Sequence, residues 1–189
     1  MSADRRARFE VTALPHLRRV HYAALHLSRP DEARDLVQET FLRAYRTFDG
    51  FTPGTNARAW LLTILYSVFA NRYRKAQREP LAVPLEEGEA QFESALARAG
   101  APYGSRGWEG LPAAAGPEVE RALAGLPEPY RDAVLLVDVQ ELTYEEAAAV
   151  LDCPIGTVRS RLFRARKLLF VALYDYARQA GYLKEPPAR

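Results

Sequence analysis

Five cationic side chains and no acid lie between Ile155 and Leu169, in the C-terminal half of the sequence. They are Arg159, Arg161, Arg164, Arg166 and Lys167. The planar guanidinium group of arginine can bond guanine O6 and N7 together or hold a phosphate, so this set has the chemistry to bind DNA. The alternative is a solvated face on a packing helix, but such a face usually mixes both signs of charge. The single sign of this segment therefore favours DNA binding.

A helix would place these cations on one side, away from a buried apolar stripe. The spacing of the apolar residues among them predicts such a helix. Four apolar residues recur at the i, i+4, i+7 and i+11 spacing of a single buried stripe: Val158, Leu162, Ala165 and Leu169. The residues on the opposite face are Ser160, Phe163, Arg164 and Lys167. We therefore expect a helix with one buried side and one basic side.

A second helix is expected directly before it. Thr143 and Glu146 have the spacing of a capping box, in which each side chain accepts a hydrogen bond from the other residue's backbone N–H. A turn is predicted at residues 151–154, because Pro154 suits the first position of the next helix. Residues 142–169 thus predict a helix-turn-helix, the shape of a DNA major-groove binding motif. Two supporting helices are expected at 118–126 and 128–142.

The run DCPIGTVRSRLFRAR within this motif resembles the promoter-binding helix-turn-helix of region 4 in the extracytoplasmic-function (ECF) group of sigma-70 family sigma factors. The preceding run LPEPYRDAVLLVDVQELTYEEAA is also typical of that region. The resemblance implies that this motif binds the upstream (minus-35) promoter element as a duplex. The residues expected to recognise bases are Ser160, Phe163 and Arg164, and those expected on the DNA backbone are Arg159, Arg161 and Arg166, with Lys167 beside them.

A second informative segment runs from Asp31 to Glu79. Its first helix has an apolar stripe of seven residues: Ala33, Leu36, Val37, Phe41, Ala44, Tyr45 and Phe48. The opposite, polar face carries Asp35, Gln38, Glu39 and Arg46. A loop is predicted at 49–54, and Thr55 or Asn56 can cap a further helix that contains Trp60, Leu61, Ile64, Leu65 and Val68. That helix is expected to end in a basic tract of Arg72, Arg74, Lys75 and Arg78.

This segment resembles region 2 of the same sigma factors. The resemblance implies that Asp35, Gln38 and Glu39 bind the clamp coiled coil of RNA polymerase. It also implies that melted DNA of the downstream (minus-10) promoter element is bound by Phe51, Asn56, Trp60, Ile64, Ser67, Asn71 and Arg72. Of these, Phe51, Ile64 and Ser67 would line a pocket for a flipped base. Such a base needs an apolar or aromatic surface in place of its stacking partners and a polar group that recognises its edge. The alternative is that Phe51 and Ile64 are ordinary core residues.

The composition of the 189 residues fits an all-α protein with two small helical domains joined by a flexible linker. We expect region 2 at 1–80, an acidic linker rich in proline and glycine at 81–116, region 4 at 117–180 and a disordered tail at 181–189. The net charge of only +2 conceals a segregated pattern, since residues 81–118 hold six acids and two arginines. Without an apolar run of about 20 residues, the chain is expected to stay in the cytoplasm with the nucleoid.

The sequence offers no candidate catalytic, metal or cofactor site. The three histidines, at 16, 21 and 26, would lie about 140° apart on a helix and cannot converge on one metal, and Cys153 is the only cysteine. The expected partners are core RNA polymerase, through its clamp and flap, promoter DNA, and an anti-sigma protein. Two alternatives stay open at this point: a free-standing helix-turn-helix regulator, and a sigma-like adaptor that binds polymerase or an inhibitor without initiating transcription.

Overall fold

The computed structural model describes residues 2–73 and 116–181, and within these residues every regular element is a helix. The chain divides into two compact units. The first unit contains Met1–Pro80 and Gln140–Val158, and the second contains Leu81–Val139 and Arg159–Arg189. The predicted linker and C-terminal tail lie almost entirely outside the described residues, as do Arg74, Lys75 and Arg78 of the predicted basic tract. The expected all-α class is confirmed for the described part.

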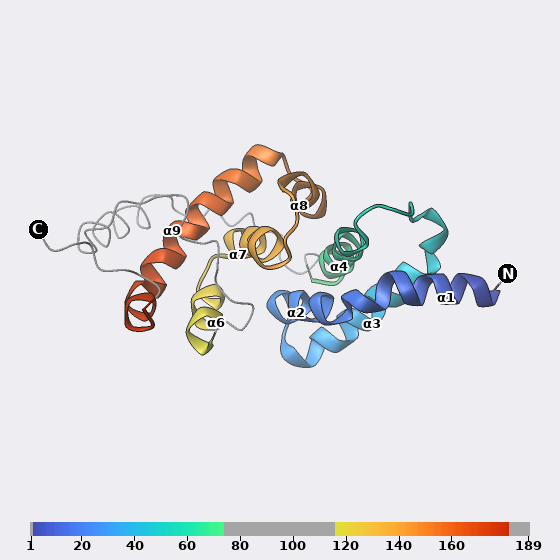
Figure 1. Ribbon diagram of the computed structural model, residues 1–189, viewed down its shortest axis with the longest axis horizontal. Helices are drawn as coiled ribbons and strands as arrows, with labels where there is room; N and C mark the ends of the chain where they lie inside the picture. Colours follow the sequence, from blue (N-terminus) through green and yellow to red (C-terminus); the bar gives the residue numbers. More distant parts are fainter. Residues whose placement is uncertain (1, 74–115, 182–189) are drawn as a thin grey trace, which may run out of the picture. The chain divides into compact units, whose positions relative to one another are not determined.

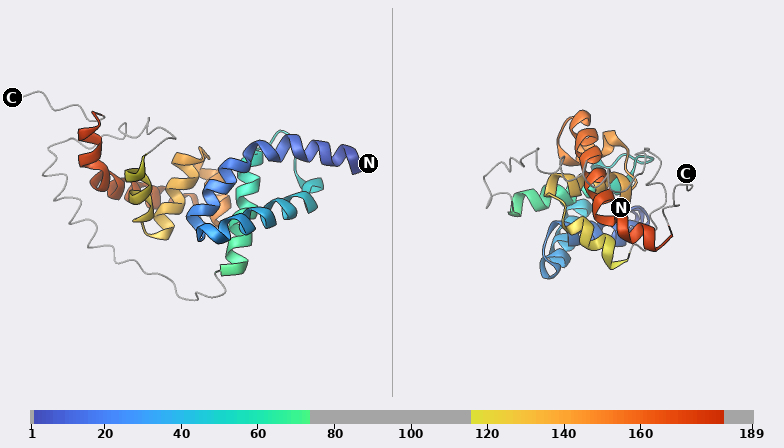
Figure 2. Two further views of the ribbon diagram at one scale, coloured as in Figure 1. Left: turned by 90° about the horizontal axis from the view of Figure 1, so that it is seen from below. Right: turned by 90° about the vertical axis from the view of Figure 1, so that its left-hand side faces the viewer.

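The first unit is built around α4. Its helices are α1 (Ser2–Ala13), η1 (Leu14–His16), α2 (Leu17–Leu27), α3 (Pro30–Arg46), η2 (Phe48–Gly50), α4 (Ala57–Tyr73) and α8 (Tyr144–Leu151). Helix α4 contacts α1, α2, α3 and α8, and the blue-to-green helices of this unit lie together in Figures 1 and 2. Leu61, Leu62 and Leu65 of α4 are fully buried, as is Leu36 of α3. Burial of these side chains supplies the main stabilisation of the unit.

Helix α3 follows the predicted apolar stripe. Its residues Ala33, Leu36, Val37 and Ala44 are buried, together with Phe48 just beyond its end. Phe41 and Tyr45 are half-buried, and their rings meet that of Phe9 of α1 edge to face, with centroids 6.5 and 5.2 Å apart. Pro30 begins the helix, and Asp31 and Glu32 in its first turn suit the positive end of the helix dipole.

The second unit contains α6 (Pro117–Ala124), α7 (Glu128–Val134), the π-helix η4 (Leu135–Val139) and α9 (Ile155–Gln179) from Arg159 onward. Leu123, Leu126, Ala133 and Val134 of these helices and their connection are buried, and Val137 is half-buried. The π-helix adds Leu135 and Leu136, which are both fully buried.

The prediction of one helix over 128–142 is wrong in its last part. The α-helical pattern of α7 ends at Val134, and η4 ends at Val139. Gln140 is then buried, and Glu141 has a φ of 57°, which a right-handed helix does not allow. Helix α9 continues ten residues beyond Leu169, the last residue of the apolar stripe, to Gln179.

Candidate nucleic-acid interface

The entry into the helix-turn-helix is fixed by the capping box that the sequence predicts. The Thr143 hydroxyl accepts a hydrogen bond from the Glu146 backbone N–H at 3.2 Å, and Glu146 Oε2 accepts one from the Thr143 N–H at 2.9 Å. Helix α8 ends where Asp152 adopts the left-handed conformation, with φ 49° and ψ 51°. The Cys153 N–H then donates to Ala148 O at 3.1 Å, which closes the turn before α9.

Helix α9 has the two faces that the sequence predicts. All four residues of the apolar stripe are at most 3% exposed: Val158, Leu162, Ala165 and Leu169. On the other side, Arg159, Ser160 and Phe163 are exposed. Arg161, Arg164 and Lys167 are half-buried along the same helix. The ammonium group of Lys167 lies 4.7 Å from the centroid of the Phe163 ring, so cation and ring form one surface.

Arg166 of α9 pairs with an acid of η4, Asp138. Its Nε and Nη2 atoms donate to Asp138 Oδ2 at 3.1 Å and Oδ1 at 2.6 Å. The two side chains are 28% and 27% exposed, so the pair is partly sheltered from water. This bidentate bond links α9 to η4. It engages guanidinium N–H groups of Arg166, which the resemblance places on a DNA phosphate. The geometry therefore favours a positioning role for Arg166.

The predicted minus-10 residues come from the loop after η2 and from α4. Phe51 lies against Trp60, with ring centroids 4.9 Å apart, and stacks on Phe48 at 6.0 Å. Ile64 and Ser67 are half-buried on α4, one helical turn apart. The last two predicted residues, Asn71 and Arg72, are exposed near the end of the same helix. Helix α4 thus carries Trp60 near its start and Arg72 near its end.

Asn56 caps α4 and also bonds to α8. Its Oδ1 atom accepts from the backbone N–H groups of Arg58 at 3.1 Å and Ala59 at 3.3 Å, as the sequence predicts for this position. Its amide nitrogen donates to Glu146 Oε1 at 2.8 Å. Both ends of the Asn56 amide are therefore engaged.

The residues just before α8 reinforce this contact within the first unit. The Gln140 side chain is 1% exposed, and its amide nitrogen donates to Arg19 O at 3.1 Å. Glu141, held at positive φ, has a carboxylate oxygen 3.5 Å from Arg58 and 3.7 Å from Arg19. Sequence reasoning missed these contacts because they join residues 83 or more positions apart; only the unusual backbone of Glu141 marks the site, and it is visible only in the structure.

The predicted polymerase-binding residues lie on the solvent side of α3. Asp35 and Gln38 are exposed, and Glu39 is half-buried. Glu39 forms an ion pair with Arg72 of α4, so this predicted polymerase contact and a predicted DNA contact meet. The polar face of α3 is therefore continuous with the basic end of α4.

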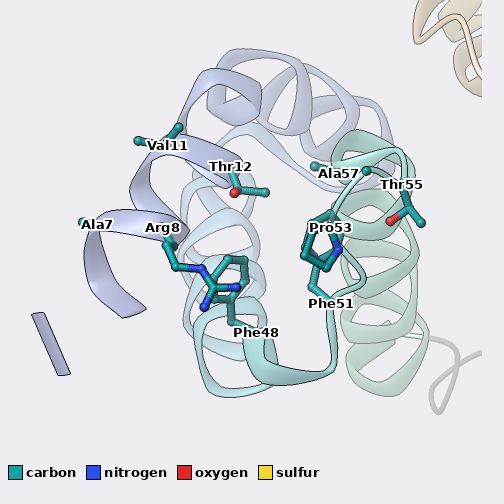
Figure 3. Close-up of a pocket in the computed structure, with 10 residues that line it drawn as sticks. Ala7, Arg8, Val11, Thr12, Phe48, Phe51, Pro53, Thr55 and Ala57 are labelled. Carbon is teal, nitrogen blue, oxygen red and sulfur yellow. The ribbon is translucent and has the colours of Figure 1, made fainter. Parts of the chain in front are cut away.

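An open groove of about 460 Å³ lies on the first unit, between α1 and the segment after η2. Figure 3 shows Arg8 and Val11 of α1 on one side and Phe51 and Pro53 on the other, with Phe48 at the base. Phe51 belongs to the predicted minus-10 residues, whereas Ile64 and Ser67 are not among the residues that line the groove. The sequence pattern predicts no contact from α1, because a short basic segment is a weak signal of binding.

His16 lies near two arginines of the first unit, Arg58 and Arg19. Burial first, and then the guanidinium groups of Arg58 and Arg19, lower the pKa of His16 from its ordinary value of 6.5. Among the described residues, no group of three or more histidine, cysteine or acidic side chains is placed to hold a metal ion. No helix of the described part is long and apolar enough to cross a membrane.

Known proteins match both halves of the chain. The family model described as Sigma-70 region 2 matches residues 13–79, and the model described as Sigma-70, region 4 matches residues 117–169. The ECF RNA polymerase sigma factor EcfG of Rhodopseudomonas palustris (strain TIE-1) is 38% identical over 165 residues, which cover 87% of this chain and 82% of that protein. The ECF RNA polymerase sigma-E factor of Escherichia coli (strain K12) is 38% identical over 138 residues, covering 71% and 70%.

Solved structures are similar over nearly the same extent. The sigma factor RpoE from Bartonella quintana, in complex with the anti-sigma factor NepR, matches with a TM-score of 0.60 and 32% identity over 85% of this chain and 93% of that one. CnrH, in complex with the cytosolic domain of CnrY, matches with a TM-score of 0.57 and 26% identity over 90% of each chain. The similarity therefore extends across both units rather than one motif.

Proposed function

This chain belongs to the ECF sigma factors of the sigma-70 family, and we propose on that basis that it binds core RNA polymerase and directs transcription from a two-part promoter. The observation that carries the proposal is the 38% identity to an ECF sigma factor over 87% of the chain. A resemblance confined to the helix-turn-helix would have suited any bacterial regulator. Two weak DNA-binding modules on one polymerase gain specificity through effective concentration.

In this proposal α9 binds the minus-35 element in the major groove. Ser160, Phe163 and Arg164 contact base edges, while Arg159, Arg161 and Lys167 contact the DNA backbone. The exposed face of α9 and its cations support this assignment. The bond between Arg166 and Asp138 supports a different role for Arg166, which holds α9 on η4.

The minus-10 element is assigned to the first unit. The aromatic pair Phe51 and Trp60 offers a stacking surface for an unpaired base, and Ile64 and Ser67 follow along α4. The remaining contacts are assigned to Asn56, Asn71 and Arg72. Asp35, Gln38 and Glu39 on α3 are assigned to the polymerase clamp, and the region 4 unit to the flap. We assign no catalytic residue to this chain, because phosphoryl transfer belongs to the polymerase. We propose that the chain acts in the cytoplasm.

Run-off transcription from linear DNA with core polymerase tests the proposal. Promoter-specific starts that depend on the added chain support it. Tight operator binding by the pure protein, with no effect on polymerase, would indicate a free-standing regulator. Polymerase binding without initiation would indicate an adaptor.

The base contacts of α9 can be tested in the same assay. Arg164→Ala should weaken recognition of the upstream element by about 1–3 kcal/mol and relax specificity at one base pair. Abortive initiation on promoters mutated one position at a time measures this loss. Equal activity of the variant across all these promoters would remove Arg164 from base recognition.

An anti-sigma protein is the second proposed protein partner. The similar structure of the sigma factor RpoE holds the anti-sigma factor NepR, and the similar structure of CnrH holds the cytosolic domain of CnrY. We propose that an anti-sigma protein covers the Asp35, Gln38 and Glu39 face and so competes with polymerase. Competition between the two for the purified chain tests this, and simultaneous binding of both would contradict it.

A further inference from the structure

We infer that α1 forms one wall of a second nucleotide site on the first unit, in which unpaired promoter DNA places a base in the groove and its phosphate on Arg8. This inference rests on the proposed function, since it extends the minus-10 contact surface. The Sigma-70 region 2 model begins at residue 13, and the groove-lining residues of α1 (Ala7, Arg8, Val11 and Thr12) precede it. The family match therefore assigns nothing to this wall.

The groove has the chemistry of a base site. Its floor and far wall contain Phe48, Phe51 and Pro53, and the facing side of α1 presents Val11, which is 77% exposed. Phe51 is half-buried and stacks on Phe48, which is only 5% exposed, so Phe51 offers the accessible aromatic surface of the groove. Aromatic faces stack unpaired bases with little preference for sequence. An exposed apolar side chain beside such faces would lose its contact with water when a base enters.

Arg8 supplies the cation that a phosphate requires. The three arginines of α1 differ in their partners: Arg5 pairs with Asp49 at 3.1 Å and donates to Tyr45 O at 2.7 Å, while Arg6 pairs with Glu10 at 2.7 Å. The guanidinium carbon of Arg8 lies 6.0 Å from the Phe48 ring centroid. Of the described carboxylates, none forms an ion pair with Arg8, and its side chain is exposed at the mouth of the groove (Figure 3).

Continuity with the proposed minus-10 surface identifies the occupant. Phe51 lines the groove and also contacts Trp60, the first aromatic ring of α4. A strand that places one base beside Phe51 and Trp60 can place a neighbouring base in the groove, between Phe51 and α1. The aromatic surface and the cation together match the base and the phosphate of a nucleotide. An apolar peptide segment would offer no anionic group to pair with Arg8. Unpaired DNA is therefore the occupant that the groove fits.

The test uses holoenzyme, reconstituted from the full chain and core polymerase, and a fork-junction promoter whose unpaired segment carries the minus-10 element. Arg8→Ala should weaken binding to this probe and lower the slope of log affinity against log salt by about 0.7, the value for one phosphate contact on a single strand. Val11→Glu should also weaken binding, because its carboxylate would face the entering phosphate. The matched control is Arg6→Ala, which removes a cation of the same helix whose charge Glu10 already balances.

Abasic positions in the unpaired segment locate the base. On wild-type holoenzyme, one abasic position should weaken binding by about 5-fold or more, namely the position whose base would occupy the groove. It is the neighbour of the base proposed to bind at Phe51 and Trp60. Arg8→Ala and this abasic probe should then show less than additive losses, because both disturb one nucleotide. Core-polymerase affinity and binding to the minus-35 duplex should stay unchanged in every variant.

Unchanged fork binding and an unchanged salt slope in Arg8→Ala, with active wild-type protein, would overturn this inference alone. A loss of core-polymerase affinity in Arg8→Ala would also overturn it, because the groove would then hold protein rather than DNA. If the wild-type chain gives no promoter-specific transcription, the proposed function fails and this inference fails with it. The wild-type control in the run-off assay separates the two failures.

Discussion

The bond between Arg166 and Asp138 links α9 to η4. It predicts that Asp138→Asn weakens DNA binding, although Asp138 itself contacts no DNA in the proposed complex. Arg166 holds both carboxylate oxygens, at 2.6 and 3.1 Å, and both side chains are about three-quarters buried. An exposed ion pair contributes about 0.2–1 kcal/mol, and a hydrogen bond to a charged group about 1.5–3 kcal/mol. A half-sheltered, two-pronged pair lies between these limits. We therefore expect removal of either partner to cost about 1–2 kcal/mol of the stability that holds α9 on η4.

Two measurements separate this positioning role from a direct phosphate contact. Hydrogen exchange of the η4 and α9 amides should speed up in both Asp138→Asn and Arg166→Gln. In holoenzyme binding to the minus-35 duplex, both variants should lose affinity by a similar factor with little change in salt slope. If Arg166 binds a phosphate instead, Arg166→Gln should lower that slope by about 0.9. Asp138→Asn would then release Arg166 and bind DNA at least as tightly as wild type, which would refute the reasoning.

Three further predictions concern single side chains. Thr143→Ala should cost about 1 kcal/mol of stability, because the exposed hydroxyl contributes mainly the cap of α8; urea denaturation measures this, and an unchanged midpoint would contradict it. His16 has a lowered pKa in the folded chain, so protonation disfavours folding, and the stability it contributes is present above about pH 6.5 and lost as the pH falls through the folded value. Urea midpoints measured at several pH values should therefore fall less on acidification in His16→Gln. Asp35→Lys should weaken core-polymerase binding, while Glu32→Lys at the start of the same helix serves as its charge-matched control; equal affinities of the two variants would contradict the assigned face.

Local patterns in the sequence predicted much of the fold. The capping box at Thr143 and the stripe along α9 depend on residues within three or four positions of one another, and both are confirmed. The apolar stripe of α3 is confirmed for the same reason, with Phe41 and Tyr45 half-buried at its edge. Periodicity of this kind fixes which side of a helix is buried before any tertiary contact is known.

The parts that sequence reasoning missed depend on distant partners. Arg166 lies 28 positions from Asp138, and Asn56 lies 90 positions from Glu146, so no local pattern marks either bond. The predicted helix over 128–142 overlooked the π-helix and the left-handed Glu141, since helix propensity says nothing of a turn imposed by packing. The groove of Arg8 joins two segments about 40 positions apart, which only the fold brings together.

The central claim is that this chain gives polymerase a two-part promoter specificity, and mapping transcript starts tests it most directly. Core polymerase with the purified chain, on DNA of its own genome, should start at sites that share an upstream and a downstream element at constant spacing. Arg164→Ala should weaken dependence on the upstream element, while Phe51→Ala should weaken dependence on the downstream one. Starts identical to those of core polymerase alone, or starts that share only one element, would contradict the account.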